Sequence, residues 1–194
     1  MQQLPVKPSP NGMTPTLVDP GFIQRGSSAL RVDRPGSHWA IDFVFPLMTV
    51  DGARAFISKL LRAKRQGLQI NIPLLVHQGI PGSPVVDGAV LAAGSTLSVR
   101  GLTPGYPVKE QYWFTVTEAD GTAYLHSVVE TVVADALGEA VLEIEPPLRA
   151  PFVDGDTIHM AKPFMQGFIE GQGYSWTVRS DRFIELTVKV EEYK

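Results

Sequence analysis

Hydrophobic and polar residues alternate along residues 38–45 and then recur at helical spacing along residues 50–66. Alternation with a period of two predicts a strand, which Pro46 ends because proline cannot donate to a sheet ladder. The next segment has one apolar stripe, which consists of Ala53, Phe56, Ile57, Leu60 and Leu61. We therefore predict a strand followed directly by a helix that packs its apolar face on a sheet.

Residues at both ends of the second segment support a helix over residues 50–66. Thr49 is a suitable N-cap, and Asp51 lies in the first turn, where the helix dipole favours an anion. Gly67 is expected to end the helix because glycine readily adopts the backbone conformation of a C-terminal cap. Residues 69–72 alternate again, which predicts a strand after the helix.

Short apolar runs and glycine-rich turns fill residues 79–150. The runs are residues 89–91, 96–99, 112–117, 123–131 and 140–144. The dipeptide Asp120-Gly121 between two of them is a hairpin signal. Several short strands at this spacing predict a small β-barrel or sandwich.

Longer runs return after Pro151. They cover residues 156–160, 164–169, 175–179 and 182–190. We interpret them as strands that complete the first sheet, which makes residues 79–150 an insertion. The predicted organisation is therefore an extended N-terminal arm of residues 1–37, a sheet domain of residues 38–78 and 151–194, and an inserted small β domain of residues 79–150. The arm is either a floppy terminus or a segment that lies along a neighbouring subunit.

Composition narrows the class of protein. The chain has 194 residues, of which 44% are hydrophobic and 19% charged, so it has enough apolar material for a folded core. A net charge of −3 disfavours a basic nucleic-acid-binding protein. Without cysteine, the chain can form neither a disulfide framework nor a thiolate metal site. We find neither a signal peptide nor an apolar run long enough to cross a bilayer, so we expect no membrane insertion.

Residue patterns that indicate catalysis or metal binding are sparse. The histidines are His38, His77, His126 and His159. No two of them have the sequence spacing of the ligands in a zinc-binding helix. The segment Asp154-Gly155-Asp156 fits either a calcium loop or, more simply, a turn. Glu143 and Glu145 share one face of a predicted strand, which suits either acid–base catalysis or a solvated surface. We favour the structural alternative each time and expect no enzymatic activity, no metal and no cofactor.

The strongest charge feature lies at the end of the predicted helix. Its basic residues are Lys59, Arg62, Lys64 and Arg65. Cations at a helix C-terminus complement the dipole, so this cluster is either a solvated helix end or a contact surface for an acidic neighbour. Nucleic-acid binding is less favoured, because no aromatic residues interleave with these cations.

Three groups of residues, in this order, resemble small tail proteins of long-tailed bacteriophages. The first is Trp39, then Phe43-x-Phe45-Pro46-x-Met48-Thr49, then a helix with Ala53, Phe56 and Leu60 that ends at Arg65-x-Gly67. The second is Pro81-Gly82 with Val85, then Val86-Asp87-Gly88-Ala89 and Gly94-x-x-Leu97-x-Val99-x-Gly101. The third is Ala134-Asp135-x-x-Gly138-x-Ala140-x-Leu142-x-Ile144-x-Pro146-Pro147-Leu148-Arg149, followed by Asp154-Gly155-Asp156 and the final Glu191-Glu192. The resemblance covers residues 36–194, and within this group it favours a distal-tail-like protein.

The resemblance implies a mainly β fold: a tail-tube-like β-sandwich or split barrel with one flanking helix and an inserted small β-barrel. It implies a structural subunit without enzymatic activity, which forms a ring, with six copies in the family, between the tail tube and the tip or baseplate. The implied partners are further copies of the chain, the tail tube protein, the hub or baseplate proteins and the tape-measure protein. The implied location is the virion tail tip, after assembly in the host cytoplasm. Ring closure would also protect the edges of long strands.

Other functions remain open at this point. A tail terminator or adaptor ring would share the same architecture. A carbohydrate- or receptor-binding module would need an exposed aromatic platform, for which Tyr112, Trp113 and Tyr124 are the candidates. The alternative is that these three are core aromatics, which we favour. A cell-wall hydrolase is disfavoured by the lack of a convincing acid–base or metal set.

Overall fold

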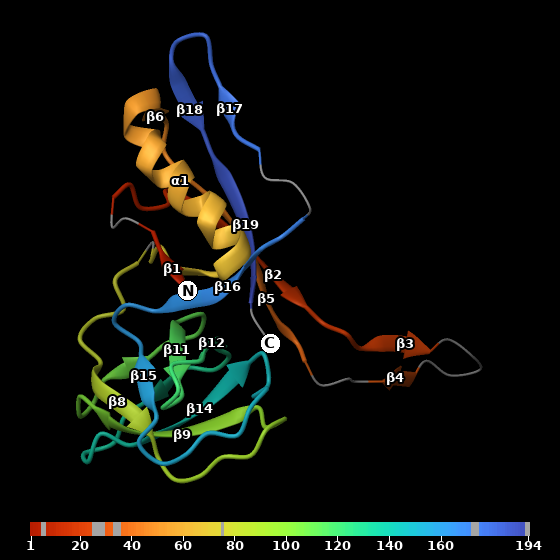
Figure 1. The fold of residues 1–194 in the computed structure, drawn as a ribbon. Coiled ribbons are helices and arrows are strands. Elements are labelled where there is room, and N and C mark those ends of the chain that lie inside the picture. The colour runs from red at the N-terminus through yellow and green to blue at the C-terminus, as the bar shows by residue number, and fades with distance from the viewer. Residues whose placement is uncertain (5–6, 25–29, 33–35, 75, 172–174, 193–194) are drawn as a thin grey trace. The chain divides into compact units, whose positions relative to one another are not determined.

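The computed structural model describes residues 1–4, 7–24, 30–32, 36–74, 76–171 and 175–192, without side-chain environments for residues 22–35. Over this part of the chain the protein is mainly β, with one helix (Figure 1). It divides into two compact units. The first comprises Met1–Thr16, Trp39–Leu75 and Phe164–Tyr193, and the second comprises Leu17–His38 and Val76–Pro163.

The first unit is built on a six-stranded sheet. In order across the sheet, the strands are β1 (Gln2–Gln3), β7 (Leu68–Asn71), β16 (Phe164–Ile169), β19 (Thr187–Glu192), β5 (His38–Val44) and β2 (Gly12–Val18). The predicted alternation in β5 is confirmed, because Ile41 and Phe43 are fully buried. They lie opposite Val190 and Val188 of β19 in an antiparallel register, so the apolar faces of the two strands coincide.

The predicted helix is confirmed as α1 (Val50–Gln66). The Thr49 hydroxyl accepts a hydrogen bond from the Gly52 N–H at 3.3 Å, and Gly67 ends the helix at a φ of 78°. Four members of the predicted stripe are buried, but Leu61 is 47% exposed and Ala63 is buried in its place. The helix contacts β16, β1 and β7, so its apolar face packs on the sheet as predicted (Figure 1).

A small three-stranded sheet lies beside the same helix. Its order is β17 (Thr177–Val178), β18 (Phe183–Glu185) and β6 (Met48–Thr49), and α1 contacts both β6 and β18. The run at residues 182–190, which we predicted as one strand, is therefore two strands separated at Leu186. The reason is that β18 pairs with β6 whereas β19 pairs with β5.

The second unit contains a closed barrel. Its strands, in order around the barrel, are β11 (Trp113–Thr117), β12 (Ala123–Val128), β14 (Ala140–Glu145), β9 (Thr96–Leu102), β8 (Gly82–Val86) and β15 (Thr157–His159). The predicted hairpin at Asp120-Gly121 joins β11 to β12, with Thr117 opposite Ala123. Two further pairs are β10 (Pro107–Val108) with β13 (Val132–Val133) and β3 (Phe22–Gln24) with β4 (Leu30–Val32).

The barrel strand β15 corrects the prediction that residues 156–160 complete the first sheet. It pairs with β11 and β8 and closes the barrel, where Ile158 is buried in the core. The second unit accordingly continues to Pro163 rather than ending at residue 150. The predicted strand at residues 89–91 is reduced to a single bridge between Val90 and Phe152.

The N-terminal segment corrects the interpretation of a floppy arm, whereas the alternative of an arm along a neighbouring subunit stays a prediction. Gln2 and Gln3 form the strand β1, which pairs in parallel with β7 of the same chain. The Asn11 N–H donates to the Val44 carbonyl at 2.9 Å, where β2 joins the other edge of the sheet. These segments are edge strands of the chain's own sheet, because each contributes backbone donors and acceptors that complete a ladder. Residues 25–29 and 33–35 of the predicted arm lie outside the described residues.

Candidate functional site

The helix α1 presents an exposed face opposite its buried stripe. Phe56 and Leu60 anchor the helix, with 1% and 0% exposure. The exposed side chains at helical spacing on the other side are Ser58, Leu61, Arg62 and Arg65. We call this set the arginine face. Because its scaffold is a packed and capped helix, these side chains project from a rigid element.

The structure divides the four basic residues of the predicted contact surface into two pairs. Lys59 Nζ donates to the Gln3 carbonyl at 3.5 Å, and Lys64 Nζ donates to the Gly171 carbonyl. Both lysines therefore bind backbone of the same chain. Arg62 and Arg65 are exposed, and neither makes a hydrogen bond or ion pair with any described residue. Within the described residues, the arginine pair is thus the part of the cluster that makes no hydrogen bond or ion pair.

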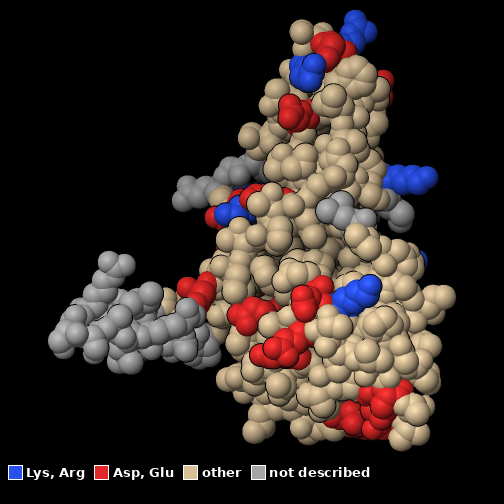
Figure 2. All heavy atoms as spheres, turned by 180° about the vertical axis from the view of Figure 1, so that it is seen from behind, with Lys and Arg blue, Asp and Glu red and all other residues tan. Residues whose placement is uncertain are grey.

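Acidic residues concentrate in the barrel segment of the second unit. Residues 76–163 contain eleven Asp and Glu against four Lys and Arg, a net charge of −7. The rest of the chain contains nine Asp and Glu against thirteen Lys and Arg, a net charge of +4. Figure 2 shows carboxylates gathered on the visible face of the barrel, with few cations among them. The overall charge of −3 therefore conceals two oppositely charged parts.

The three aromatic residues proposed as a ligand platform do not share an exposed surface. Trp113 is only 7% exposed. Tyr124 is half-buried, with its ring edge-to-face against Phe152 at 5.5 Å between centroids and Arg149 over it at 5.2 Å. Tyr112 is half-buried and packs against the barrel core. The core interpretation therefore describes these side chains better than a sugar-binding platform.

His126 is a titratable side chain whose burial the sequence patterns did not indicate. It is fully buried and stacks on Phe114 at 5.7 Å between ring centroids. Its Nδ1 lies 2.9 Å from the Pro146 carbonyl, which can only accept, so Nδ1 carries the proton and donates. Its Nε2 is buried and has no hydrogen-bond partner among the described residues. Burial lowers its pKa from 6.5 to about 4, with Arg149 adding to this effect, so the ring is neutral near pH 7.

The carboxylates of the possible calcium loop are engaged in protein contacts. Asp154 receives two hydrogen bonds from the Arg100 guanidinium, at 3.0 and 3.2 Å, and one from the Gly88 N–H at 3.0 Å. Asp156 Oδ2 accepts from the Val153 N–H at 2.9 Å, which closes a turn. The segment is therefore a structural turn. The described residues include no cluster of histidine and carboxylate side chains suited to a metal ion.

The two glutamates of the possible acid–base pair lie on the outer side of β14. Leu142 and Ile144 alternate with them and are fully buried in the barrel core. Glu143 is exposed and Glu145 is half-buried. The pair thus belongs to a barrel surface, which agrees with the interpretation that we favoured.

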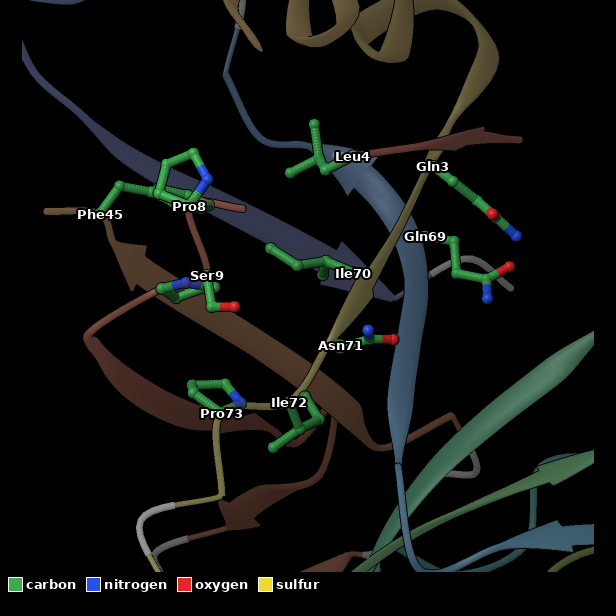
Figure 3. Close-up of a pocket in the computed structure, with 11 residues that line it drawn as sticks. Gln3, Leu4, Pro8, Ser9, Phe45, Gln69, Ile70, Asn71, Ile72 and Pro73 are labelled. Atoms are coloured by element: carbon green, nitrogen blue, oxygen red, sulfur yellow. The ribbon is translucent and has the colours of Figure 1, made fainter. Parts of the chain in front are cut away.

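A hollow of about 200 Å³ in the first unit is lined by the N-terminal segment and β7 (Figure 3). In Figure 3 the amide side chains of Gln3, Gln69 and Asn71 lie on one side, and Pro8 and Pro73 lie on the other. No charged residue is among the described lining residues. The hollow is smaller than typical ligand sites and offers no titratable group for acid–base chemistry.

No protein-family model matches the chain, and no match is found among curated proteins. Within the described residues, no helix combines the length and apolar character needed to span a membrane.

Proposed function

We propose that this chain is a ring-forming structural subunit of the tail tip of a long-tailed bacteriophage, similar to a distal tail protein. The observation that carries the proposal is the order of the fold: a sheet with a flanking helix, interrupted between β7 and β16 by a closed barrel. This is the order that the resemblance of residues 36–194 implies. In this proposal the sheet and α1 correspond to the tube-type β-sandwich or split-barrel domain.

The edges of the main sheet support assembly through limited contacts rather than open-ended strand addition. The edge strand β1 has only two residues. The other edge strand, β2, contains Pro15, which lacks a backbone donor. Short edges and edge prolines discourage uncontrolled pairing with other sheets. A closed ring of identical subunits is consistent with such edges, and we propose six copies by analogy with the family.

The proposed role is mechanical and needs no catalysis or cofactor. The ring would connect the tail tube to the hub or baseplate, with the tube, hub and tape-measure proteins as its neighbours in the virion. Assembly would take place in the host cytoplasm. A net charge of −3 per chain gives a ring that is acidic overall, which disfavours tight binding of passing DNA.

Electron microscopy and mass photometry of the purified chain, alone and mixed with the tail tube and hub proteins encoded beside it, test the proposal. We expect closed rings of uniform size, with hexamers as the expected species. A chain that stays monomeric in every mixture would overturn it. A ring that binds only the end of the tube facing the head would instead identify a tail terminator.

A further inference from the structure

The separation of charge within one chain suggests how neighbouring subunits bind each other. We propose that the arginine face of one copy docks on an acidic outer surface of the barrel of a second copy. This inference rests on the proposed ring function and specifies its subunit contact. A second copy of the chain is the expected partner because the charges are complementary. The barrel segment, residues 76–163, carries a net charge of −7, and the remainder of the chain carries +4.

The donor surface combines two cations with one exposed apolar residue at its edge. Arg62 and Arg65 lie about one helical turn apart, and Leu61, at the edge of the same face, is 47% exposed. Lys59 and Lys64 each donate to a backbone carbonyl, which leaves Arg62 and Arg65 as the cations of this cluster without a hydrogen bond among the described residues. Guanidinium groups bind carboxylates through two parallel hydrogen bonds and are less strongly hydrated than ammonium groups. The arginine face thus suits an interface that brings carboxylates and a small apolar surface side by side.

The barrel offers a matching surface around β14. Val141 and Glu143 lie on the same outward side of this strand, and Val129 lies beside Glu143, whose carbonyl accepts from the Val129 N–H at 2.9 Å. Val141 is 59% exposed and Val129 is 41% exposed, and the Glu143 side chain is also exposed. We call these three residues the β14 patch. The β14 patch contains exposed apolar side chains and one carboxylate. The arginine face likewise contains an exposed apolar side chain, together with two cations.

The contact joins two different surfaces, so it is heterologous. Repetition of a heterologous contact closes a ring when the rotation between subunits allows it. Each exposed ion pair is weak alone and is screened by salt. Association should therefore depend on both arginines and weaken as the salt concentration rises from about 0.05 M to about 0.5 M.

Cysteine cross-linking tests the contact directly, because the native chain contains no cysteine. Ser58→Cys places a thiol on the arginine face, and Thr96→Cys places one opposite Glu143 in the register of β9 and β14. A short bis-maleimide should convert the double variant into a ladder of covalent oligomers. The control pairs Ser58→Cys with Ala119→Cys, in the exposed β11–β12 turn, and should give no ladder. Cross-linked monomers without a ladder would overturn the inference.

Charge exchange provides the second test. Arg62→Glu with Arg65→Glu should weaken association at least about tenfold in mass photometry, with an unchanged circular dichroism spectrum. Adding Glu143→Arg to that variant should restore association in part.

If both sets of variants form rings as well as the unmodified chain does, the docking inference fails while the ring function stands. If the ladder forms but no rings are seen, the ring function fails while the contact stands. If the variant with Ser58→Cys and Thr96→Cys gives no ladder and the unmodified chain forms no rings, both fail.

Discussion

The side-chain amide of Gln78 pairs with both backbone polar groups of Trp113. Its Oε1 accepts from the Trp113 N–H at 2.8 Å, and its Nε2 donates to the Trp113 carbonyl at 2.9 Å. The same Nε2 also donates to the Met160 carbonyl at 2.8 Å. Gln78 is only 3% exposed, and its own carbonyl accepts the hydroxyl of Tyr106, whose pKa burial raises to about 12. One side chain thus links the start of β11 to the segment after β15.

Replacing Gln78 should therefore destabilise the barrel. Gln78→Ala leaves three buried backbone groups without these partners, so we expect a loss of about 2–4 kcal/mol in the free energy of unfolding. Gln78→Glu should also be destabilising, because a carboxylate accepts but cannot donate to the two carbonyls. Urea denaturation measures both losses. Gln3→Ala removes the same side chain at an exposed position and should cost less than about 1 kcal/mol. Equal losses at the two positions would refute this role.

His126 should make the stability of the barrel depend on pH. Its pKa is about 4 in the folded protein and 6.5 as a free side chain, so the unfolded chain binds the extra proton first. The free energy of unfolding should fall by about 3 kcal/mol as the pH drops from 6.5 to 4, with no further loss from this residue below that. Burial also lowers the pKa of His159, which adds a loss of the same sign. In urea denaturation across this range, His126→Phe should flatten the dependence and His159→Gln should flatten it less. Parallel profiles for His126→Phe and the unmodified chain would contradict this assignment.

Local signals explain why the helix was predictable. The Thr49 cap, the Gly67 stop and the stripe through Phe56 and Leu60 all act within a few residues, and the structure reproduces each of them. Only Leu61 was misplaced, because one step along a helix turns the side chain by about 100° and carries it out of the buried face.

Long-range pairing explains where sequence patterns failed. The strand β15 has three residues, and only its pairing with β11 and β8 assigns it to the barrel. The strands at either edge of the main sheet, β1 and β2, likewise depend on partners far along the chain. Such pairings are set by the tertiary fold and not by local alternation.

The candidate site was predictable only in outline. The basic cluster was visible in the sequence, but which cations remain free depends on the carbonyls of Gln3 and Gly171, which the fold brings to Lys59 and Lys64. His126 occupies an alternating strand like many exposed histidines, and only the closed barrel reveals its burial. Charge counted by segment would have revealed the acidic barrel from the sequence alone.

Trp113 should prove structural rather than ligand-binding. The side chain is 7% exposed, so Trp113→Ala should cost about 3–5 kcal/mol in the free energy of unfolding. Trp176→Ala removes the same side chain at a position that is 37% exposed and should cost about 1 kcal/mol or less. Thermal and urea unfolding compare the two variants. A Trp113→Ala protein with unchanged stability that loses binding on a glycan array would instead favour a carbohydrate-binding module.

Two glycines of the main sheet should differ sharply in their tolerance of a methyl group. A Cβ at Gly167 in β16 would lie 2.1 Å from the Glu191 carbonyl oxygen of the neighbouring strand β19. The backbone of the neighbouring strand cannot shift there without a large energetic cost. Gly167→Ala should therefore lower the free energy of unfolding by more than about 3 kcal/mol or prevent folding. A Cβ at Gly12 in β2 would meet only the Val44 Cβ, at 3.9 Å, an ordinary contact, so Gly12→Ala should change stability by less than about 1 kcal/mol. Soluble yield and urea midpoints of the two variants measure the difference, and a well-folded Gly167→Ala protein with the midpoint of the unmodified chain would show that β16 and β19 are not paired in this register.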